Sequence, residues 1–229
     1  MTLKWLHKKL SNVYSIVPLV MLVLFASFKS TSFVSTITNY TAKEMFTGIF
    51  FGSGALASNV TILQQFNIRN FTSDAKTISQ VSNEQEQIYA KVNAQHPEYM
   101  AALKIAIGSG NHLRIESAIR EGARYIGEAY SSLHPEVSSE MKESLAKDFA
   151  SHVDVKNATP EELRQAINDY TDAGSGTGVF AKQACVVLLL LIAIAILLVV
   201  PLLAADDTQV EATLAKEMIV GALAKSGAK

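Results

Sequence analysis

An uncharged apolar stretch near the C-terminus, Cys185 to Ala204, limits what this chain can fold into more than any other feature. Between Val186 and Leu203, every residue except two alanines and a proline is leucine, isoleucine or valine. A helix of about 20 residues is about 30 Å long, which matches the hydrocarbon thickness of a bilayer. Aliphatic residues at roughly −0.3 to −0.6 kcal/mol each favour insertion of such a helix into lipid. The stretch therefore predicts a helix that enters a membrane.

The alternative is a helix buried on every side in the core of a soluble domain. Without its two apolar blocks the chain keeps about 150 residues, and a domain of that size has little capacity to surround such a helix. Basic residues near the ends are few, Lys182 against Lys216, so the positive-inside rule fixes no orientation. Six aliphatic positions are the expected lipid contacts: Val186, Leu189, Ile192, Ile196, Val200 and Leu203.

The N-terminus has the pattern of a secretory signal peptide. Lys4, Lys8 and Lys9 form a basic start, an apolar run extends from about Val13 to Phe28, and polar residues follow. That order predicts export through a Sec-type signal peptide that signal peptidase removes. The other interpretation is an uncleaved signal-anchor helix. The protein is therefore expected to be secreted or membrane-associated.

The sequence between the two apolar blocks predicts an all-α bundle. Helix starts are marked by Asx or threonine caps and by prolines that suit the first helical position. Apolar residues then recur at steps of three and four, as Met100, Leu103 and Ile107 do. No run of alternating residues competes as a strand. The expected helices are Ala42–Val60, one from Asp74 to about Ala94, Pro97–Gly108, and helices that begin after Asn111, at Pro135 and at Pro160.

Three glycines interrupt the first of these helices. Gly48 and Gly52 are four residues apart and Gly54 follows, although each glycine weakens a helix by about 1 kcal/mol relative to alanine. One explanation is a helix-packing motif, in which a second backbone comes close. The other is a loop break at Gly52-Ser53-Gly54. The residues alone leave both explanations open.

No pattern in the sequence predicts an enzyme, a metal site or a cofactor. The histidines lack the i, i+4 spacing of a helical metal site, and a single cysteine, Cys185, excludes an intrachain disulfide. The segment GSGTG at 174–178 lacks the lysine of a phosphate-binding loop and follows a polar helix. Its composition is that of a linker. A net charge of −1 also lacks the basic excess of a nucleic-acid-binding protein.

Three stretches resemble a known family in their order along the chain. MFTGIFFGSGALA (45–57) resembles the aromatic-x-Gly-x-x-Phe-Gly-x-Gly motif of the sporulation-delaying protein (SdpC-type) toxin family. HPEYMAALKIAIGSGNHLRIESAI (96–119) resembles that family's P-x-Y-M helix and the helix after it. VEATLAKEMI (210–219) resembles its short tail. In this tail, helical spacing returns through Val210, Leu214, Met218 and Leu223.

The resemblance implies a secreted bacterial precursor of a bacteriocin-like toxin. Proteolysis would release the apolar segment, roughly Val179 to Ala205, which would collapse the proton gradient across target-cell membranes. The implied partners are the lipid bilayer, processing proteases and an integral-membrane immunity protein, with no nucleic acid. One departure concerns the disulfide of the best-known member, because Cys185 here has no second cysteine to pair with.

The chain is accordingly divided into six predicted parts. They are a signal peptide (1–28), a polar spacer (29–41), a helical pro-domain (42–172), a Gly/Ser linker (173–178), a hydrophobic toxin-like segment (179–205) and an amphipathic tail (206–229). Two other functions remain open at this point. The first is a membrane-anchored extracytoplasmic helical domain that binds a partner, and the second is an immunity or chaperone-like protein that binds a toxin through the Gly48/Gly52 face.

Overall fold

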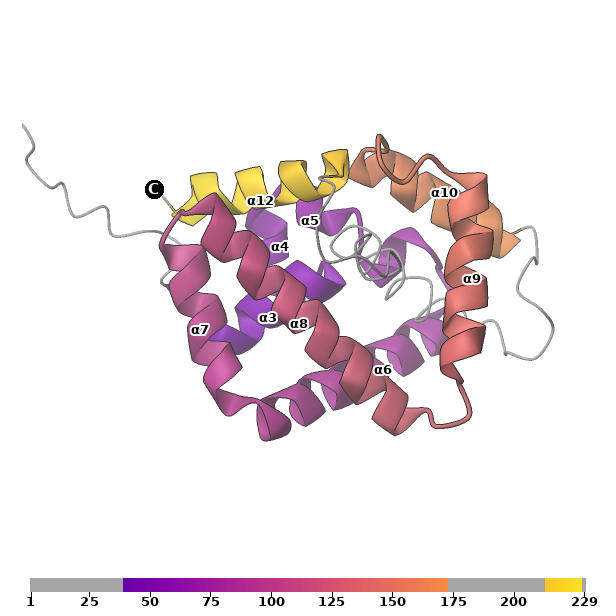
Figure 1. The fold of residues 1–229 in the computed structure, drawn as a ribbon, viewed down its shortest axis with the longest axis horizontal. Helices are drawn as coiled ribbons and strands as arrows, with labels where there is room; N and C mark the ends of the chain where they lie inside the picture. Colours follow the sequence, from indigo (N-terminus) through magenta and orange to yellow (C-terminus); the bar gives the residue numbers. More distant parts are fainter. Residues whose placement is uncertain (1–38, 173–212, 228–229) are drawn as a thin grey trace, which may run out of the picture. The chain divides into compact units, whose positions relative to one another are not determined.

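The computed structural model describes residues 39–172 and 213–227, and all regular secondary structure in those two ranges is helical (Figure 1). The all-α class is therefore confirmed for that part of the chain. The elements are α3 (Ala42–Phe51), α4 (Gly54–Asn59), α5 (Thr61–Gln64), the 3-10 turn η2 (Ile68–Asn70), α6 (Ala75–Gln95), α7 (Pro97–Gly108), α8 (His112–Leu133), α9 (Ser139–His152), α10 (Pro160–Asp172) and α12 (Leu214–Gly227).

The predicted signal peptide (1–28), the Gly/Ser linker (173–178) and the apolar segment (179–205) lie outside the described residues. Within 39–172 and 213–227, none of the helices has both the length and the apolar character needed to span a bilayer.

Side-chain caps set most of the helix starts at the predicted residues. The Asp74 carboxylate accepts a hydrogen bond from the Thr77 amide at 2.8 Å, and Asn111 accepts one from the Arg114 amide at 3.1 Å. At α10, the Thr159 amide donates to the Glu162 carboxylate at 2.8 Å and the Glu162 amide returns a bond to the Thr159 hydroxyl. These bonds satisfy amides that the first helical turn leaves without partners.

One predicted boundary is wrong, and at a second the structure shows the loop break that the sequence had left open. The helix expected from Pro135 begins at Ser139 instead, because the Val137 amide donates to the His134 carbonyl at 3.0 Å and closes a turn there. The helix expected over Ala42–Val60 is divided, since α3 ends at Phe51 and α4 begins at Gly54.

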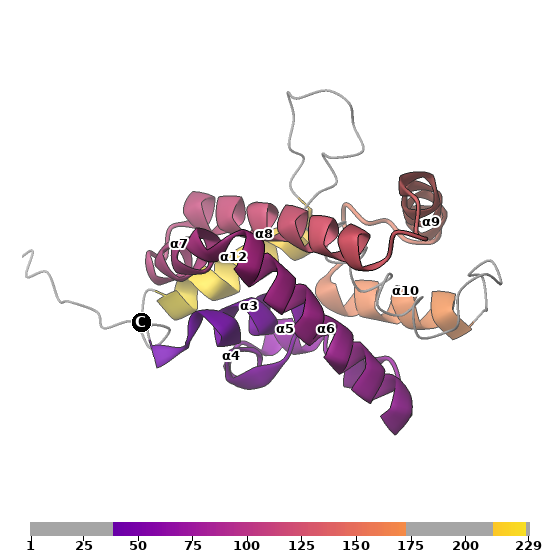
Figure 2. The same cartoon turned by 90° about the horizontal axis from the view of Figure 1, so that it is seen from below.

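Helix α3 occupies the centre of the packing among the described helices. It contacts α4, α6 and α7, and α8 in turn packs against both α6 and α7 (Figure 2). Phe46, Phe50 and Phe51 are buried, and the Phe46 ring centroid lies 4.9 Å from that of Phe50. A helix that is apolar on most of its surface has to be covered on most sides, which explains this central position.

A histidine joins the middle of α6 to the end of α8. The Nε2 of His134 hydrogen-bonds Glu84, and its Nδ1 lies 3.0 Å from a carboxylate oxygen of Glu136. The Tyr130 ring packs against the imidazole. Ionised carboxylates only accept hydrogen bonds, so both contacts form when the imidazole carries a proton on each nitrogen.

This arrangement predicts a pH-dependent contribution to stability. Burial by itself lowers the pKa of His134, but the hydrogen bonds to Glu84 and Glu136 outweigh it and raise that pKa above its usual range. The contribution is therefore complete below the unfolded pKa of about 6.5 and is lost as the pH rises through the folded pKa. The difference in unfolding free energy between the parent chain and His134→Gln should shrink from about pH 5 to about pH 9. A difference that stays constant over this range would contradict the assignment.

Candidate functional site: the helices that flank residues 173–212

The segment expected to enter the membrane lies between two described helices, α10 and α12. Its six expected lipid contacts, Val186, Leu189, Ile192, Ile196, Val200 and Leu203, all fall within 173–212, outside the described residues. The described chain stops at Asp172, the last residue of α10, and resumes at Thr213, just before α12. The structure shows which contacts hold these two flanking helices in place.

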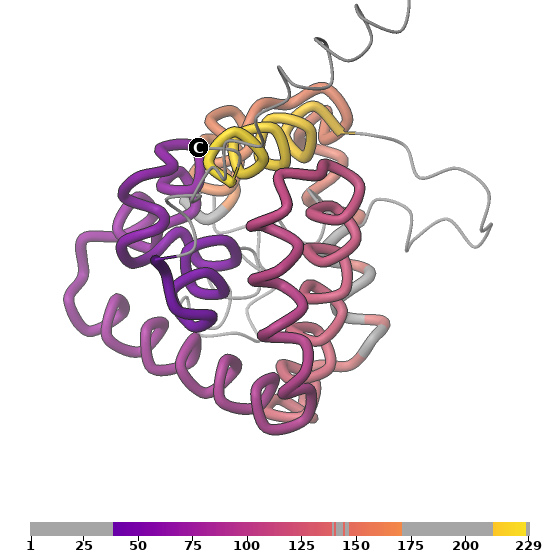
Figure 3. Tube along the Cα trace, turned by 90° about the vertical axis from the view of Figure 1, so that its left-hand side faces the viewer, coloured from indigo at the N-terminus to yellow at the C-terminus, as the bar shows by residue number. Residues whose placement is uncertain are grey.

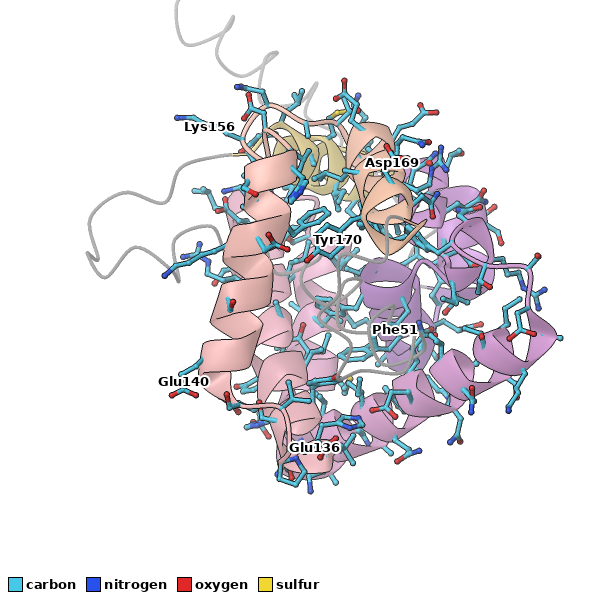
Figure 4. The ribbon with its side chains drawn as sticks, turned by 90° about the vertical axis from the view of Figure 1, so that its right-hand side faces the viewer. Phe51, Glu136, Glu140, Lys156, Asp169 and Tyr170 are labelled. Carbon is cyan, nitrogen blue, oxygen red and sulfur yellow. The ribbon has the colours of Figure 1, made fainter. Side chains whose placement is uncertain are left out.

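Helix α10 is held by its apolar face and by a polar bond to Gln65, at the end of α5. Tyr170 is buried and points from α10 toward α9, where its ring meets Phe149 edge-on and its hydroxyl donates to Asp148 (Figure 4). The Arg164 guanidinium donates to the Gln65 side chain at 3.0 Å, across 99 residues of sequence. The predicted apolar face of α10 is largely confirmed, with Leu163, Ile167 and Tyr170 buried and Ala166 partly buried.

The predicted apolar face of α12 is only partly right: Leu223 is buried, Leu214 and Met218 are exposed, and Val210 lies outside the described residues. The tail pattern placed Leu214 and Met218 on the apolar side, but these side chains are 44% and 40% exposed. The buried side of the helix is Ala215, Lys216, Ile219, Val220, Leu223, Ala224 and Gly227. Two sides of α12 carry apolar residues four positions apart, one with Leu214 and Met218 and the other with Ala215, Ile219 and Leu223. The face with small residues is buried because small side chains let two helices approach closely.

Helix α12 packs against α7, α8 and α5 (Figure 3). Three contacts along its length fix its direction relative to α7 and α8. Near its start, Lys216 pairs with Glu116 of α8. Farther on, a Cβ on Gly221 would reach His112 at 4.0 Å. At its end, a Cβ on Gly227 would overlap the Ile107 carbonyl oxygen. Later residues of α12 thus meet earlier residues of α8 and then the last turn of α7, so α12 runs antiparallel to the first part of α8.

The Lys216–Glu116 ion pair is the main charged contact of this site. The Lys216 side chain is 5% exposed, that of Glu116 is 19% exposed, and Nζ lies 3.0 Å from the carboxylate. Among the side chains that the structure describes, Lys216 is the one charged group classed as buried. From the sequence, Lys216 was considered only as a flanking charge of the apolar segment. Its position after Ala215 and four residues before Val220, both apolar, was the available signal of burial.

The start of α12 is fixed close to the start of α10. Thr213 is buried, and its hydroxyl accepts from the Lys216 amide at 3.2 Å. The Leu214 amide donates to the Lys156 carbonyl at 3.0 Å. Lys156 lies in the connection that leads from α9 into the Thr159 cap of α10. The described chain therefore resumes, at Thr213, beside the connection that leads into α10.

The three glycines named from the sequence form a corner between α3 and α4. Gly52 ends α3 at a φ of 60°, and a Cβ there would come within 2.5 Å of the Leu63 carbonyl oxygen. Gly54 also has a positive φ, 80°, and begins α4. Gly48 lies against α4, where a Cβ would be 2.9 Å from that of Leu56. The break and the close approach thus occur together, and the close partner belongs to the same chain.

A tyrosine of the P-x-Y-M stretch ties α7 to α8. The Tyr99 hydroxyl donates to the Ala118 carbonyl at 2.8 Å. Burial raises the pKa of Tyr99 far above its usual range, with a smaller contribution from Glu121, so the hydroxyl keeps its proton. Gly122 lies beneath the Tyr99 and Phe50 rings and leaves them the space that a side chain would fill.

The three stretches that carry the family resemblance meet in space. The first covers α3 and α4, the second covers α7 and the first half of α8, and the third enters α12. Contacts join α3 to α7, α7 to α8, and α12 to both α7 and α8. Stretches separated by long intervals of sequence thus build one packed unit, and the tail is part of it.

A family model described as "Sporulation delaying protein family toxin" matches residues 37–227 of the chain. No curated protein and no solved structure matches it.

Proposed function

The chain belongs to the sporulation delaying protein family of toxins, and from that premise we propose that it is the exported precursor of a membrane-active peptide. The peptide comes from residues 179–205 and acts by inserting into and depolarising the membranes of target cells. The observation that carries the proposal is the uncharged aliphatic run from Val186 to Leu203, inside a family match that extends over 37–227. Membership in a toxin family also suggests a secreted protein, and export follows from the signal-peptide pattern at 1–28.

The flanking helices support a precursor from which the peptide is cut at two places. Helix α10 is bonded to Gln65 and packed on α9, and α12 is packed on α7 and α8. A peptide from between them can leave only when the chain is cut both after Asp172 and before Thr213. Signal peptidase acts at the N-terminus, so at least one further protease belongs to the proposal.

The proposed activity is physical rather than catalytic. Insertion of an aliphatic helix into lipid needs no catalytic residue, metal or cofactor from the chain, so we propose that the protein is not an enzyme. The lipid bilayer is then the direct partner. A producing cell whose own membrane meets the same peptide needs protection, and an integral-membrane immunity protein is the proposed means.

A synthetic peptide of residues 179–205 tests the mechanism. We expect it to dissipate a potassium diffusion potential across phosphatidylglycerol-containing vesicles, read with a voltage-sensitive dye. The matched control carries Leu189→Arg and Ile196→Arg, because each central arginine opposes insertion by roughly 2.5–3.5 kcal/mol. Intact potentials at high loading of the parent peptide would rule out the mechanism.

Mass spectrometry of the culture medium tests the precursor. The proposal predicts a short peptide whose two ends lie within residues 173–212. The alternative, a membrane-anchored extracytoplasmic domain, predicts the full-length chain in the cell membrane and no such peptide in the medium.

A further inference from the structure

We propose that α12 stays bound to the helical body, residues 39–172, after the chain is cut on both sides of the apolar segment. The pieces left behind are then one noncovalent complex of two chains. The biological setting of this inference rests on the proposed function, because that function supplies the cuts. The binding itself follows from the contacts of α12 with the body.

The described contacts that hold α12 are made with the body. Its ion pair is with Glu116, its first amide bonds the Lys156 carbonyl, and its last described residue lies against the Ile107 carbonyl. Each of these partners belongs to the body. A cut in the connecting segment therefore removes the covalent link and leaves every one of these contacts in place.

The apolar face of α12 is the larger reason to expect retention. Ile219 and Val220 are 5% and 3% exposed, and Leu223 is fully buried. On separation, these side chains and the faces of α7 and α8 that they cover would all enter water, which opposes dissociation. Lys216 adds specificity, since its charge is buried against Glu116 and a helix in another register would leave that carboxylate without it.

Binding also preserves the helix itself. Helix α12 has 14 residues, and an isolated helix of about that length is marginal in water. A cut piece that left the body would lose most of its helical structure along with its burial. The bound helix, by contrast, keeps the parts of α7 and α8 that it contacts covered.

The test uses the full chain in mild detergent, with a protease recognition sequence inserted between Asp207 and Thr208 and an affinity tag after Lys229. Denaturing electrophoresis first verifies that the chain has been cut. The tagged C-terminal piece is then captured under native conditions. We expect the body to be captured with it in near-equal amounts, and a body that flows through while the tagged piece is retained would overturn the inference.

A matched pair of variants separates docking from shared residence in a micelle. Leu223→Glu places a charge on the buried face of α12, and Met218→Glu places the same charge on the exposed face. Partition into detergent would respond to both charges alike. Docking should lose about tenfold or more of the captured body with Leu223→Glu and little with Met218→Glu. Equal losses in the two variants would contradict docking.

A second pair serves if the Leu223→Glu chain does not fold. Gly227→Ala adds a Cβ that overlaps the Ile107 carbonyl, whereas Gly221→Ala adds one with its nearest neighbour at 4.0 Å. Only the first should weaken capture. The cut is engineered and the assay measures retention of the body. An inactive 179–205 peptide would therefore contradict the proposed toxin mechanism but would not change the result of the capture assay.

Discussion

Alanine at Gly122 should destabilise the helical body by about 2–4 kcal/mol, from overpacking together with a strained hydrogen bond. Gly122 is buried on α8, and a Cβ there would overlap the Tyr99 hydroxyl and the tip of the Phe50 ring. Both rings belong to the core and are almost fully buried. Neither can swing away as an exposed flexible side chain would. Any shift of Tyr99 also strains its bond to the Ala118 carbonyl.

Gly127 is the matched control for that substitution. It lies on the same helix, is exposed, and a Cβ there would have no neighbour within 4 Å. Alanine is favoured over glycine inside a helix by about 1 kcal/mol, so Gly127→Ala should stabilise the protein. Urea unfolding of both variants beside the parent chain measures the contrast. A loss of stability at Gly127, or none at Gly122, would show that the packing of α8 against α3 and α7 is wrong.

Removal of the Glu116 carboxylate is expected to cost about 3 kcal/mol, because it leaves the buried charge of Lys216 without its partner. Arg120 also lies near Glu116, but at 3.5 Å and on the exposed side of α8, so its loss contributes little. The double variant Glu116→Ala with Lys216→Met removes both charges. It should recover most of the loss, since a buried pair can be replaced by apolar groups at small cost.

The measurement is a double-mutant cycle on the free energy of unfolding. Strictly additive effects of the two substitutions would mean that the ion pair does not join α12 to α8. Lys225 is exposed on α12, the same helix as Lys216, and provides a control for loss of a lysine. Its replacement by methionine should change stability by less than about 0.5 kcal/mol.

Local sequence was sufficient where the deciding interaction spans a few residues. The starts of α6, α8 and α10 depend on the side chains of Asp74, Asn111 and Thr159, each of which bonds the amide three positions ahead. Such bonds form within one turn and need no other part of the chain. The predicted start of α9 at Pro135 was wrong because residues His134 to Val137 form a turn, and the helix begins after it.

The site was only partly predictable from the sequence. The apolar run and its flanks were visible as composition, and the resemblance of 45–57, 96–119 and 210–219 to one family is confirmed by the match over 37–227. The partners of those stretches were not visible. The close neighbour of Gly48, for example, is α4 of the same chain, and only a three-dimensional arrangement could distinguish it from a second helix or another protein.

The sequence by itself determined the helical class, most helix starts, the uncharged run and the family, because each depends on residues that are neighbours along the chain. The tertiary structure decided which face of α12 is buried. Leu214 and Met218 are also apolar and four residues apart, but the buried face combines Ile219, Val220 and Leu223 with small residues, and Gly227 lies directly against the Ile107 carbonyl. Helical periodicity gives the possible faces of a helix, and the shape of the neighbouring helices selects among them.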